Sequence, residues 1–191
     1  MQLITLSGYQ RAGKTLTAQL LQQLTGWPIL STSDYLIEIC AMNTGRSILE
    51  IQQMKHVYRE KLIDLGMRIE AQEPARLVKH LLIEHLQKEP NTEGIILDSV
   101  RRASEVQYLK QAYPKTIFLL LEAERTTRAS RGELACEDDP TELEAVSALQ
   151  NLGEAVVIPN NDSYEALQDA VDDIVAKYII QEPLGLYVEK H

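Results

Sequence analysis

The pattern with the clearest chemistry lies near the amino terminus and reads Gly8-Tyr9-Gln10-Arg11-Ala12-Gly13-Lys14-Thr15. It matches G-x-x-x-x-G-K-[ST] at every position. The two glycines let the loop wrap closely, so that successive backbone N–H groups point into one concavity. Such a concavity binds phosphate oxygens, and the positive end of the following helix, with Leu16 in its first turn, adds to the attraction. The stretch therefore predicts a phosphate-binding loop, a P-loop.

Two side chains of this loop have expected roles toward a nucleoside triphosphate. Lys14 is expected to be an exposed loop cation that reaches the β- and γ-phosphates, and the Thr15 hydroxyl to ligate Mg²⁺. Asp98 ends the apolar run 94–98 and is a second candidate ligand, because Mg²⁺ prefers carboxylates and waters. A turn or helix-cap carboxylate is the alternative for Asp98. ATP and Mg²⁺ are thus the expected cofactors.

Arginines recur every three residues after the apolar run 116–121, at Arg125, Arg128 and Arg131. On a helix this spacing puts like charges on one broad face, where they repel one another unless an anion lies there. The cluster stands out because the chain is acidic, with 19 basic and 28 acidic residues and a net charge of −9. We interpret it as a clamp on the transferring phosphoryl group. A solvated helix face paired with local glutamates is the alternative.

Further polar residues are candidates for a second ligand. Arg59 and Arg101 could each grip a second phosphate, which an ATPase does not need; surface arginines are the alternative. Asp34 could contact a hydroxyl or a metal-bound water, or cap a helix. Arg11 starts close to the reacting phosphates and could supply an arginine in cis; an exposed side chain facing solvent is equally compatible with the sequence.

These residues follow short apolar runs that predict strands over 2–7, 27–31, 94–98, 116–121 and 155–158. Helical spacing of apolar residues lies between them, over 14–25, 33–41, 47–72, 74–89, 103–112 and 163–179, with helical pieces over 123–150. Strands that are apolar throughout and alternate with helices indicate an α/β fold: a five-stranded parallel sheet with helices on both faces. Ligands of such folds bind where strands end and helices begin.

Composition narrows the class of protein. The chain has 191 residues, 45% of them apolar, which fits one globular domain over 1–180 with a tail over 181–191. The acidic balance disfavours nucleic acid and anionic membrane as partners, and the longest aliphatic run is far short of a membrane span. Two cysteines, Cys40 and Cys136, are expected as reduced thiols, and no secretion signal is apparent, so we expect a cytoplasmic protein.

The pieces together resemble the nucleoside monophosphate kinase branch of P-loop proteins, and most closely the phage-type deoxynucleoside monophosphate kinases and their adenylate-kinase-like and dephospho-CoA-kinase-like relatives. The P-loop, with Arg11 before its second glycine, is similar to the family's variant. Three further stretches look like the family's substrate-binding helices, the segment after its third core strand, and its lid; they are residues 59–66, 98–105, and 128–131 with 138–140.

The resemblance implies a donor of ATP with Mg²⁺ and an acceptor that is a nucleoside or deoxynucleoside monophosphate, in a monomer or homodimer. By matching position, Arg59 and Arg101 would hold the acceptor phosphate. Arg131, with Arg128 beside it, would lie on the adenine or the phosphates, and Asn160 or Asn161 near the donor base. Substrate-binding helices would span about 33–89 and a short lid about 125–140.

One departure from that family keeps alternatives open. Related lids carry further arginines, whereas residues 132–137 here contain two acids and no base. The alternatives are a kinase of another small molecule, with Asp34 as the base toward a hydroxyl acceptor, and a weakly catalytic nucleotide-binding module. The missing N-K-x-D motif, for which Asn160-Asn161-Asp162 is the nearest stretch, argues against a switch GTPase. The stretch 132–139 is expected to be the most mobile interior segment.

Overall fold

The five expected strands form one sheet in the computed structural model, which describes residues 1–132, 134 and 140–179. All of them run parallel, in the order β2-β3-β1-β4-β5, which confirms the predicted sheet. β1 is the central strand, so the P-loop leaves the carboxyl end of the middle of the sheet. The strands are β1 (Gln2–Gly8), β2 (Ile29–Ser31), β3 (Gly94–Asp98), β4 (Ile117–Glu122) and β5 (Val156–Pro159).

Side chains of the strands alternate between two apolar layers, one on each face of the sheet. Ile4 of β1 lies in register with Ile96 of β3 and Ile117 of β4. Ile4 and Ile96 belong to one apolar cluster, whereas Leu3 and Ile95 belong to the other. Because successive residues of a strand face opposite ways, strands buried on both faces must be apolar at nearly every position.

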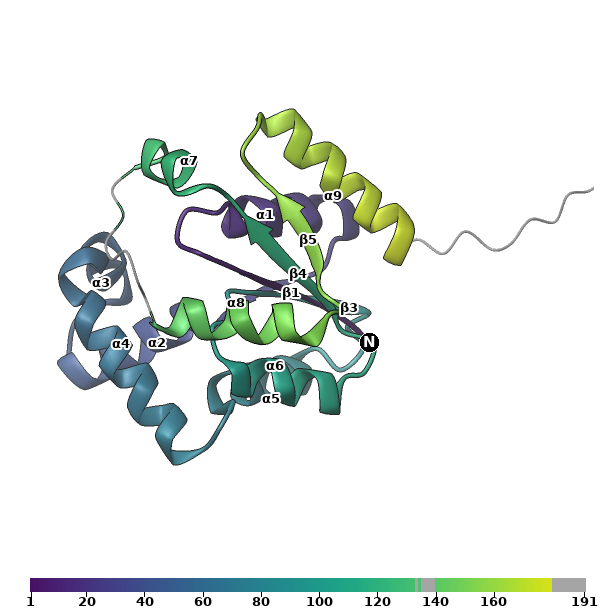
Figure 1. Cartoon of the computed structure of the whole chain (residues 1–191). Helices are drawn as coiled ribbons and strands as arrows, with labels where there is room; N and C mark the ends of the chain where they lie inside the picture. The colour runs from purple at the N-terminus through teal and green to yellow at the C-terminus, as the bar shows by residue number, and fades with distance from the viewer. Residues whose placement is uncertain (133, 135–139, 180–191) are drawn as a thin grey trace, which may run out of the picture.

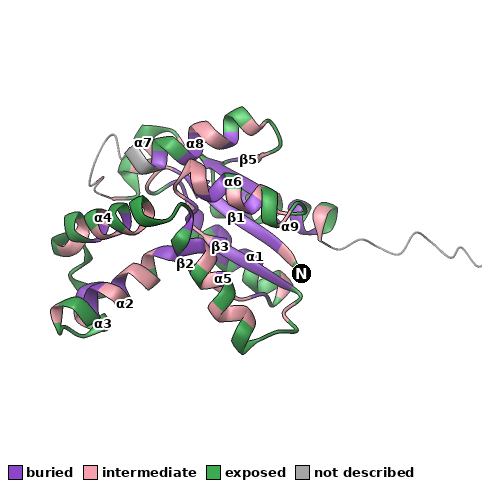
Figure 2. Cartoon of the chain, turned by 90° about the horizontal axis from the view of Figure 1, so that it is seen from below, coloured by how far each residue is buried: buried purple, intermediate pink, exposed green. Residues whose placement is uncertain are grey.

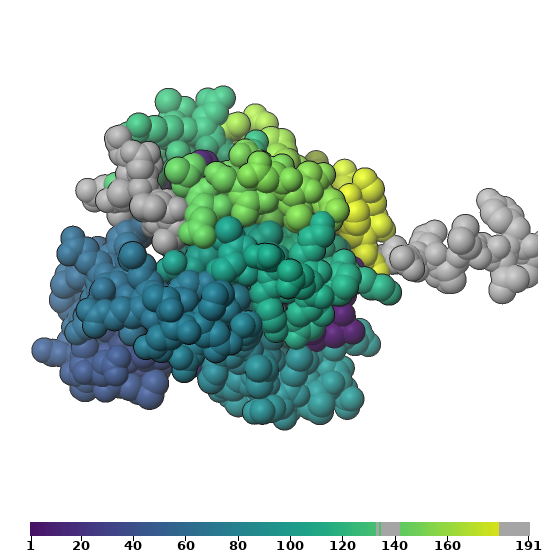
Figure 3. All heavy atoms as spheres, turned by 60° about the horizontal axis from the view of Figure 1, so that its bottom comes forward, coloured from purple at the N-terminus to yellow at the C-terminus, as the bar shows by residue number. Residues whose placement is uncertain are grey.

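Helices cover both faces of the sheet, as predicted (Figure 1). α1 and α9 pack on one face, and α5, α6 and α8 on the other, with α8 lying against α6 (Figure 3). Their bounds, with those of the remaining helices, are α1 (Lys14–Thr25), α2 (Thr32–Thr44), α3 (Ile48–Gln53), α4 (Lys55–Gln72), α5 (Arg76–Lys88), α6 (Ala103–Ala112), α7 (Arg125–Ser130), α8 (Pro140–Leu152) and α9 (Tyr164–Tyr178).

The helices α2, α3 and α4 extend away from the buried strands and pack around a small apolar cluster of their own (Figure 2). The single helix expected over 47–72 is wrong, because the chain breaks at Met54. This residue has φ −104° and ψ 28°, ends α3 and precedes α4. The break makes Lys55 the first residue of α4, at the edge of the cavity described below.

The expected lid over 125–140 is described only in part. Its first section forms α7, and α8 begins at Pro140. Residues 133 and 135–139, with Cys136, lie outside the described residues, as does the expected tail over 181–191; Cys40 is a buried free thiol. Within the part of the chain that the structure describes, no helix is long and apolar enough to cross a membrane.

One packing contact in the sheet gives a test of the fold. A Cβ atom added at Gly94, the first residue of β3, would overlap the indole ring of Trp27, which is 8% exposed. We expect Gly94→Ala to lower the free energy of unfolding by about 1–3 kcal/mol, the usual cost of an overpacked core. Urea denaturation measures it.

Gly26→Ala is the matched control. Its φ of +71° strains an alanine, but a Cβ there would meet nothing within 4 Å. We expect Gly26→Ala to lower the free energy of unfolding by about 1–2 kcal/mol, because of the left-handed backbone alone. Trp27→Leu should leave this loss unchanged. If Trp27→Leu does not reduce the loss of stability caused by Gly94→Ala, the described contact between Gly94 and Trp27 is wrong.

Candidate functional site

The P-loop leaves β1 with two glycines in conformations and spaces that other residues do not fit. Gly8 has φ +138° and Gly13 has φ +106°. A Cβ at Gly8 would overlap the backbone carbonyl of Leu121 on β4, and one at Gly13 would overlap the side-chain amide of Asn160. Positive φ and close backbone approach are the two requirements that only glycine meets. The loop is therefore bent tightly against the carboxyl ends of β4 and β5.

Lys14 folds back into this bend instead of extending into solvent, so the expectation of an exposed cation is wrong. The residue is 9% exposed, and its Nζ donates to the carbonyl oxygens of Gly8 at 2.6 Å and Tyr9 at 2.9 Å. Burial lowers the pKa of Lys14 to about 8; Glu142 and Asp98 oppose the decrease, and Arg101 and Arg128 add to it. The ammonium group is thus held beneath the cradle before any ligand arrives.

The two expected Mg²⁺ ligands lie together at the carboxyl ends of β1 and β3. The Thr15 hydroxyl donates to Asp98 Oδ2 at 3.4 Å, and Ser99 Oγ donates to Asp98 Oδ1 at 3.0 Å. Asp98 is not a helix cap, because α6 begins five residues later with Arg102 as its N-cap. Among the described residues no group of three or more His, Cys, Asp or Glu side chains could hold a metal. A hydroxyl and one carboxylate fit Mg²⁺, which keeps several waters and takes phosphate oxygens as further ligands.

A reciprocal clasp joins the P-loop to the end of α7. Arg11 Nη1 donates to the carbonyl oxygen of Arg131 at 2.7 Å, and Arg131 Nη1 donates to that of Arg11 at 3.2 Å. Arg131 Nη2 also donates to the carbonyl oxygen of Asn160 at 2.9 Å. Asn160, which is 4% exposed, donates from Nδ2 to Ala12 at 2.8 Å. These residues therefore lie together on one side of the loop, with the Arg11 guanidinium directed toward α7.

Arg128 approaches the loop from the same helix. Its guanidinium lies over the ring of Tyr9, 5.0 Å from the centroid, and donates to the carbonyl oxygens of Ala123 at 3.2 Å and Gln10 at 3.4 Å. Arg125 is exposed. Arg128 and Arg131 therefore both turn toward the P-loop, where each donates to a backbone carbonyl oxygen.

The P-loop opens into a cavity of about 1230 Å³. This exceeds the roughly 300–1,000 Å³ of a site for one small ligand, and so leaves room for a donor and an acceptor. The expected acceptor residues Asp34, Arg59 and Arg101 all line it. Asp34 is not a helix cap, because Ser31 caps α2 and accepts from the backbone N–H of Asp34 at 3.3 Å.

This cavity holds more positive charge than the sequence indicated. Lys55 and Arg102 line it together with Arg59 and Arg101. Burial lowers the pKa of Lys55, and Arg101 and Arg59 lower it further, while Asp34 and Asp98 raise it. Lys55 follows the break at Met54 and Arg102 follows Arg101, so their positions depend on turns that apolar spacing does not reveal.

A buried carboxylate fixes the loop that carries these arginines. Glu105 is 2% exposed, and its Oε2 accepts from the backbone N–H groups of Arg101 at 2.8 Å and Arg102 at 3.1 Å. Burial raises the pKa of Glu105 to about 7, against the lowering effect of the two N–H donors. Glu105 therefore orients Arg101 through its backbone and leaves the guanidinium available to the cavity.

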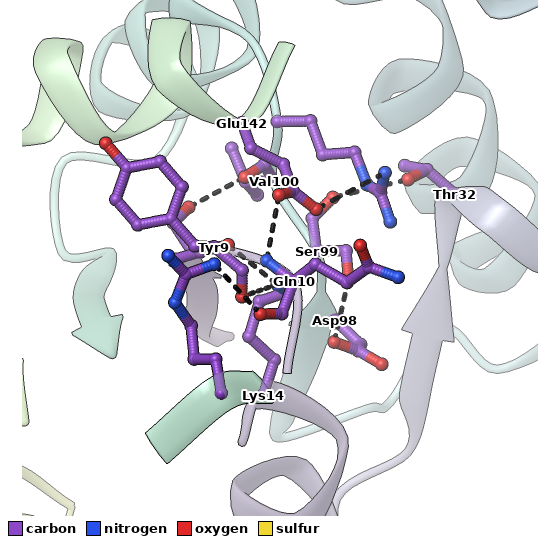
Figure 4. A network of polar contacts seen from close by, with 12 residues as sticks. Tyr9, Gln10, Lys14, Thr32, Asp98, Ser99, Val100 and Glu142 are labelled. Atoms are coloured by element: carbon purple, nitrogen blue, oxygen red, sulfur yellow. Dashed lines mark hydrogen bonds and ion pairs between the residues drawn. The ribbon is translucent and has the colours of Figure 1, made fainter. Parts of the chain in front are cut away.

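Sequence reasoning also missed Glu142, in the first turn of α8 (Figure 4). It is 6% exposed, and its Oε2 accepts from the backbone N–H of Gln10 in the P-loop at 2.8 Å. Its Oε1 lies 3.9 Å from Nη1 of Arg101. A carboxylate in the first turn of a helix is common, and nothing local in the sequence indicates a partner 132 residues away.

Comparisons with known proteins establish the fold. No protein-family model matches the chain, and no curated protein matches it by sequence. Solved structures do resemble it. They include TT1252 from Thermus thermophilus (20% identity, 91% of this chain and 96% of that chain, TM-score 0.54), a sugar kinase from Janibacter sp. HTCC2649 (15%, 92% and 93%, 0.50) and shikimate kinase from Bacteroides thetaiotaomicron (15%, 91% and 96%, 0.49).

The buried carboxylate under the arginine loop gives a pH test. The pKa of Glu105 is about 7 in the folded protein, above its ordinary value of 4.5, so the folded state binds this proton more tightly than the unfolded state. The contribution of Glu105 to stability is therefore present below about pH 4.5 and is lost as the pH rises to about 7. Glu105→Gln keeps an acceptor but cannot ionise.

We expect the wild type to lose about 1–3 kcal/mol relative to Glu105→Gln between pH 5 and pH 8. Urea denaturation at each pH measures both proteins, and exposed Glu154→Gln controls for the loss of one acid. Parallel stability profiles for wild type and Glu105→Gln would show that the buried group does not titrate in this range.

Proposed function

We propose that the protein is an ATP-dependent phosphotransferase whose acceptor is a nucleoside or deoxynucleoside monophosphate. One observation carries this: a single cavity joins the P-loop to a second group of cations, with Arg101 and Arg59 among them. A triphosphate at the P-loop accounts for the first group. An acceptor that itself carries a phosphate accounts for the second, because guanidinium groups bind phosphate oxygens in pairs.

The donor would be bound mainly by the backbone. N–H groups of the P-loop take the phosphate oxygens, and Lys14, already beneath the loop, neutralises charge as it moves toward the γ-phosphoryl group. Thr15 and Asp98 would hold Mg²⁺, which would offset part of the negative charge of the triphosphate. Asn160 supports the loop and lies on the side proposed for the nucleotide base.

Arginines would then stabilise the transition state. Arg11, Arg128 and Arg131 now donate to carbonyl oxygens of the loop and its neighbours, and phosphate oxygens can replace those acceptors. Arg59 and Arg101 would hold the acceptor phosphate so that one of its oxygens points at the γ-phosphorus. Phosphoryl transfer needs little covalent help, so positioning and charge neutralisation are the contributions we assign to these residues.

A hydroxyl acceptor is the second candidate. Asp34 lines the cavity and could accept the proton of an attacking hydroxyl, as a general base must. The similarity of the fold to a sugar kinase supports this candidate, at 15% identity. The guanidinium groups of Arg59 and Arg101 favour the phosphorylated acceptor, because such groups bind phosphate oxygens in pairs.

An assay of ADP release separates the candidates. ATP with Mg²⁺ is offered with each of the common ribonucleoside and deoxyribonucleoside monophosphates, with a panel of sugars and hydroxy acids, and with no acceptor. We expect release only with monophosphates. Release with hydroxyl compounds alone would replace our first candidate by the second, and tight ATP binding without release in any mixture would identify a nucleotide-binding module.

Removal of the P-loop ammonium group tests the donor side. We expect Lys14→Ala to lower kcat by at least about 100-fold, since it removes charge stabilisation from the transition state. The fold should persist, because the variant loses the hydrogen bonds of the ammonium group but no longer has to bury its charge. Steady-state kinetics and circular dichroism measure the two effects, with the partly exposed Lys110→Ala as control. Turnover like that of the wild type would contradict the P-loop role.

Removal of one acceptor-side cation tests the second subsite. We expect Arg101→Ala to raise the KM for the monophosphate by at least about tenfold, the cost of a lost charged hydrogen bond, and to leave the KM for ATP within a few-fold. Arg68→Ala on the exposed side of α4 is the control. An ATP-binding defect with an unchanged monophosphate KM would mean that the two subsites are exchanged.

A further inference from the structure

The P-loop of this chain binds an anion that belongs to the chain itself. Glu142 reaches across from α8, and its Oε2 accepts the backbone N–H of Gln10 at 2.8 Å (Figure 4). The side chain is almost completely buried. A buried carboxylate is stable only where charge and hydrogen bonds compensate the loss of water, so its position marks a point of the cavity that attracts anions.

The charges around Glu142 come from several elements. Lys14 of α1 lies close enough to Glu142 for the carboxylate to raise the pKa of the lysine, and Arg101 lies 3.9 Å from Glu142 on the loop after β3. Asp98 is the acid that shares this neighbourhood. Glu142 therefore lies between the ammonium group of Lys14 and the guanidinium group of Arg101, whose charges compensate part of the cost of burying it.

Glu142 also lies between the two subsites. On one side it contacts Gln10 in the loop proposed to bind the donor, and on the other it contacts Arg101, proposed to bind the acceptor. In the proposed reaction, a phosphoryl group that passes from donor to acceptor would cross the space between these two residues. The Gln10 N–H has one hydrogen to donate, and a carboxylate and a γ-phosphate this close would repel each other strongly.

We propose that Glu142 is an internal competitor that occupies the γ-phosphoryl position, so that ATP binds by displacing one anion with another. This rests on the proposed function only in taking a triphosphate as the ligand of the P-loop. The effect is specific for the terminal phosphate. ADP leaves the position between Gln10 and Arg101 to the carboxylate, whereas ATP must expel it. The protein therefore discriminates against ATP relative to ADP until Glu142 has moved.

Titration calorimetry with Mg²⁺-ATP, Mg²⁺-ADP and inorganic pyrophosphate tests this on the full chain. Glu142→Gln removes the charge and keeps the shape. Glu144→Gln is the matched control, since it lies on the same helix, is exposed and accepts a hydrogen bond from the backbone of Ala103. We expect Glu142→Gln to bind ATP about tenfold or more tightly than the wild type, and ADP within about threefold. Glu144→Gln should match the wild type with both ligands.

Glu142→Ala is a second variant, in case the glutamine of Glu142→Gln still accepts the hydrogen bond from the backbone N–H of Gln10. It should give an equal or larger gain for ATP, with thermal unfolding reporting that the protein is folded. Equal ATP affinities for wild type and both folded variants would overturn the competitor role. So would unchanged ATP affinity with a kcat at least tenfold lower, which would mean that Glu142 acts in the transfer itself.

The pyrophosphate titration separates this inference from the proposed reaction. Tighter binding of pyrophosphate and ATP by Glu142→Gln, in a protein that transfers no phosphoryl group to monophosphates, would support the competitor and contradict the proposed function. Transfer to monophosphates, with no tighter binding of ATP or pyrophosphate by the variants, would support the proposed function and contradict the competitor. If no variant and no wild-type sample binds any of the three ligands, both are contradicted.

Discussion

The approach of the P-loop to its neighbouring strands is the constraint on which the rest of the site depends. Gly8 lies against the carbonyl of Leu121, and Gly13 against the side chain of Asn160, with no room for a Cβ atom at either position. The bend this produces brings N–H groups and the Lys14 ammonium into a small volume. In a chain with a net charge of −9, this bend creates a local region of positive potential, which requires an anion or a hydrogen-bond acceptor to neutralise it.

The ligand-free chain neutralises this region with its own groups. Lys14 donates to two carbonyl oxygens of the loop, Arg131 and Arg11 donate to each other's backbone, and Glu142 fills the space between Gln10 and Arg101. Every one of these bonds has an acceptor that a phosphate oxygen can replace. The cavity is therefore preorganised, and the nucleotide binding that we propose would exchange hydrogen-bond partners rather than create a site. Such an exchange favours discrimination among nucleotides by the number of their phosphate groups and by where those groups lie in the site.

The sequence predicted the sheet and the loop well, because both depend on short-range patterns: continuous apolar runs and two glycines at fixed spacing. It also predicted that Thr15 and Asp98 meet, since parallel strands end at one edge. What it missed depends on contacts between distant segments. The burial of Lys14, the break at Met54 that positions Lys55, and the arrival of Glu142 at Gln10 each follow from packing that no local pattern encodes.

Phosphorus NMR of one reaction mixture tests the proposed chemistry most directly. The protein is added to ATP, Mg²⁺ and a monophosphate, and the resonances of all phosphorus atoms are followed together. We expect the γ-phosphorus signal of ATP and the signal of the monophosphate to fall in equal amounts while signals of two diphosphates rise. Loss of the γ-signal into inorganic phosphate, with the monophosphate unchanged, would contradict phosphoryl transfer between the two subsites.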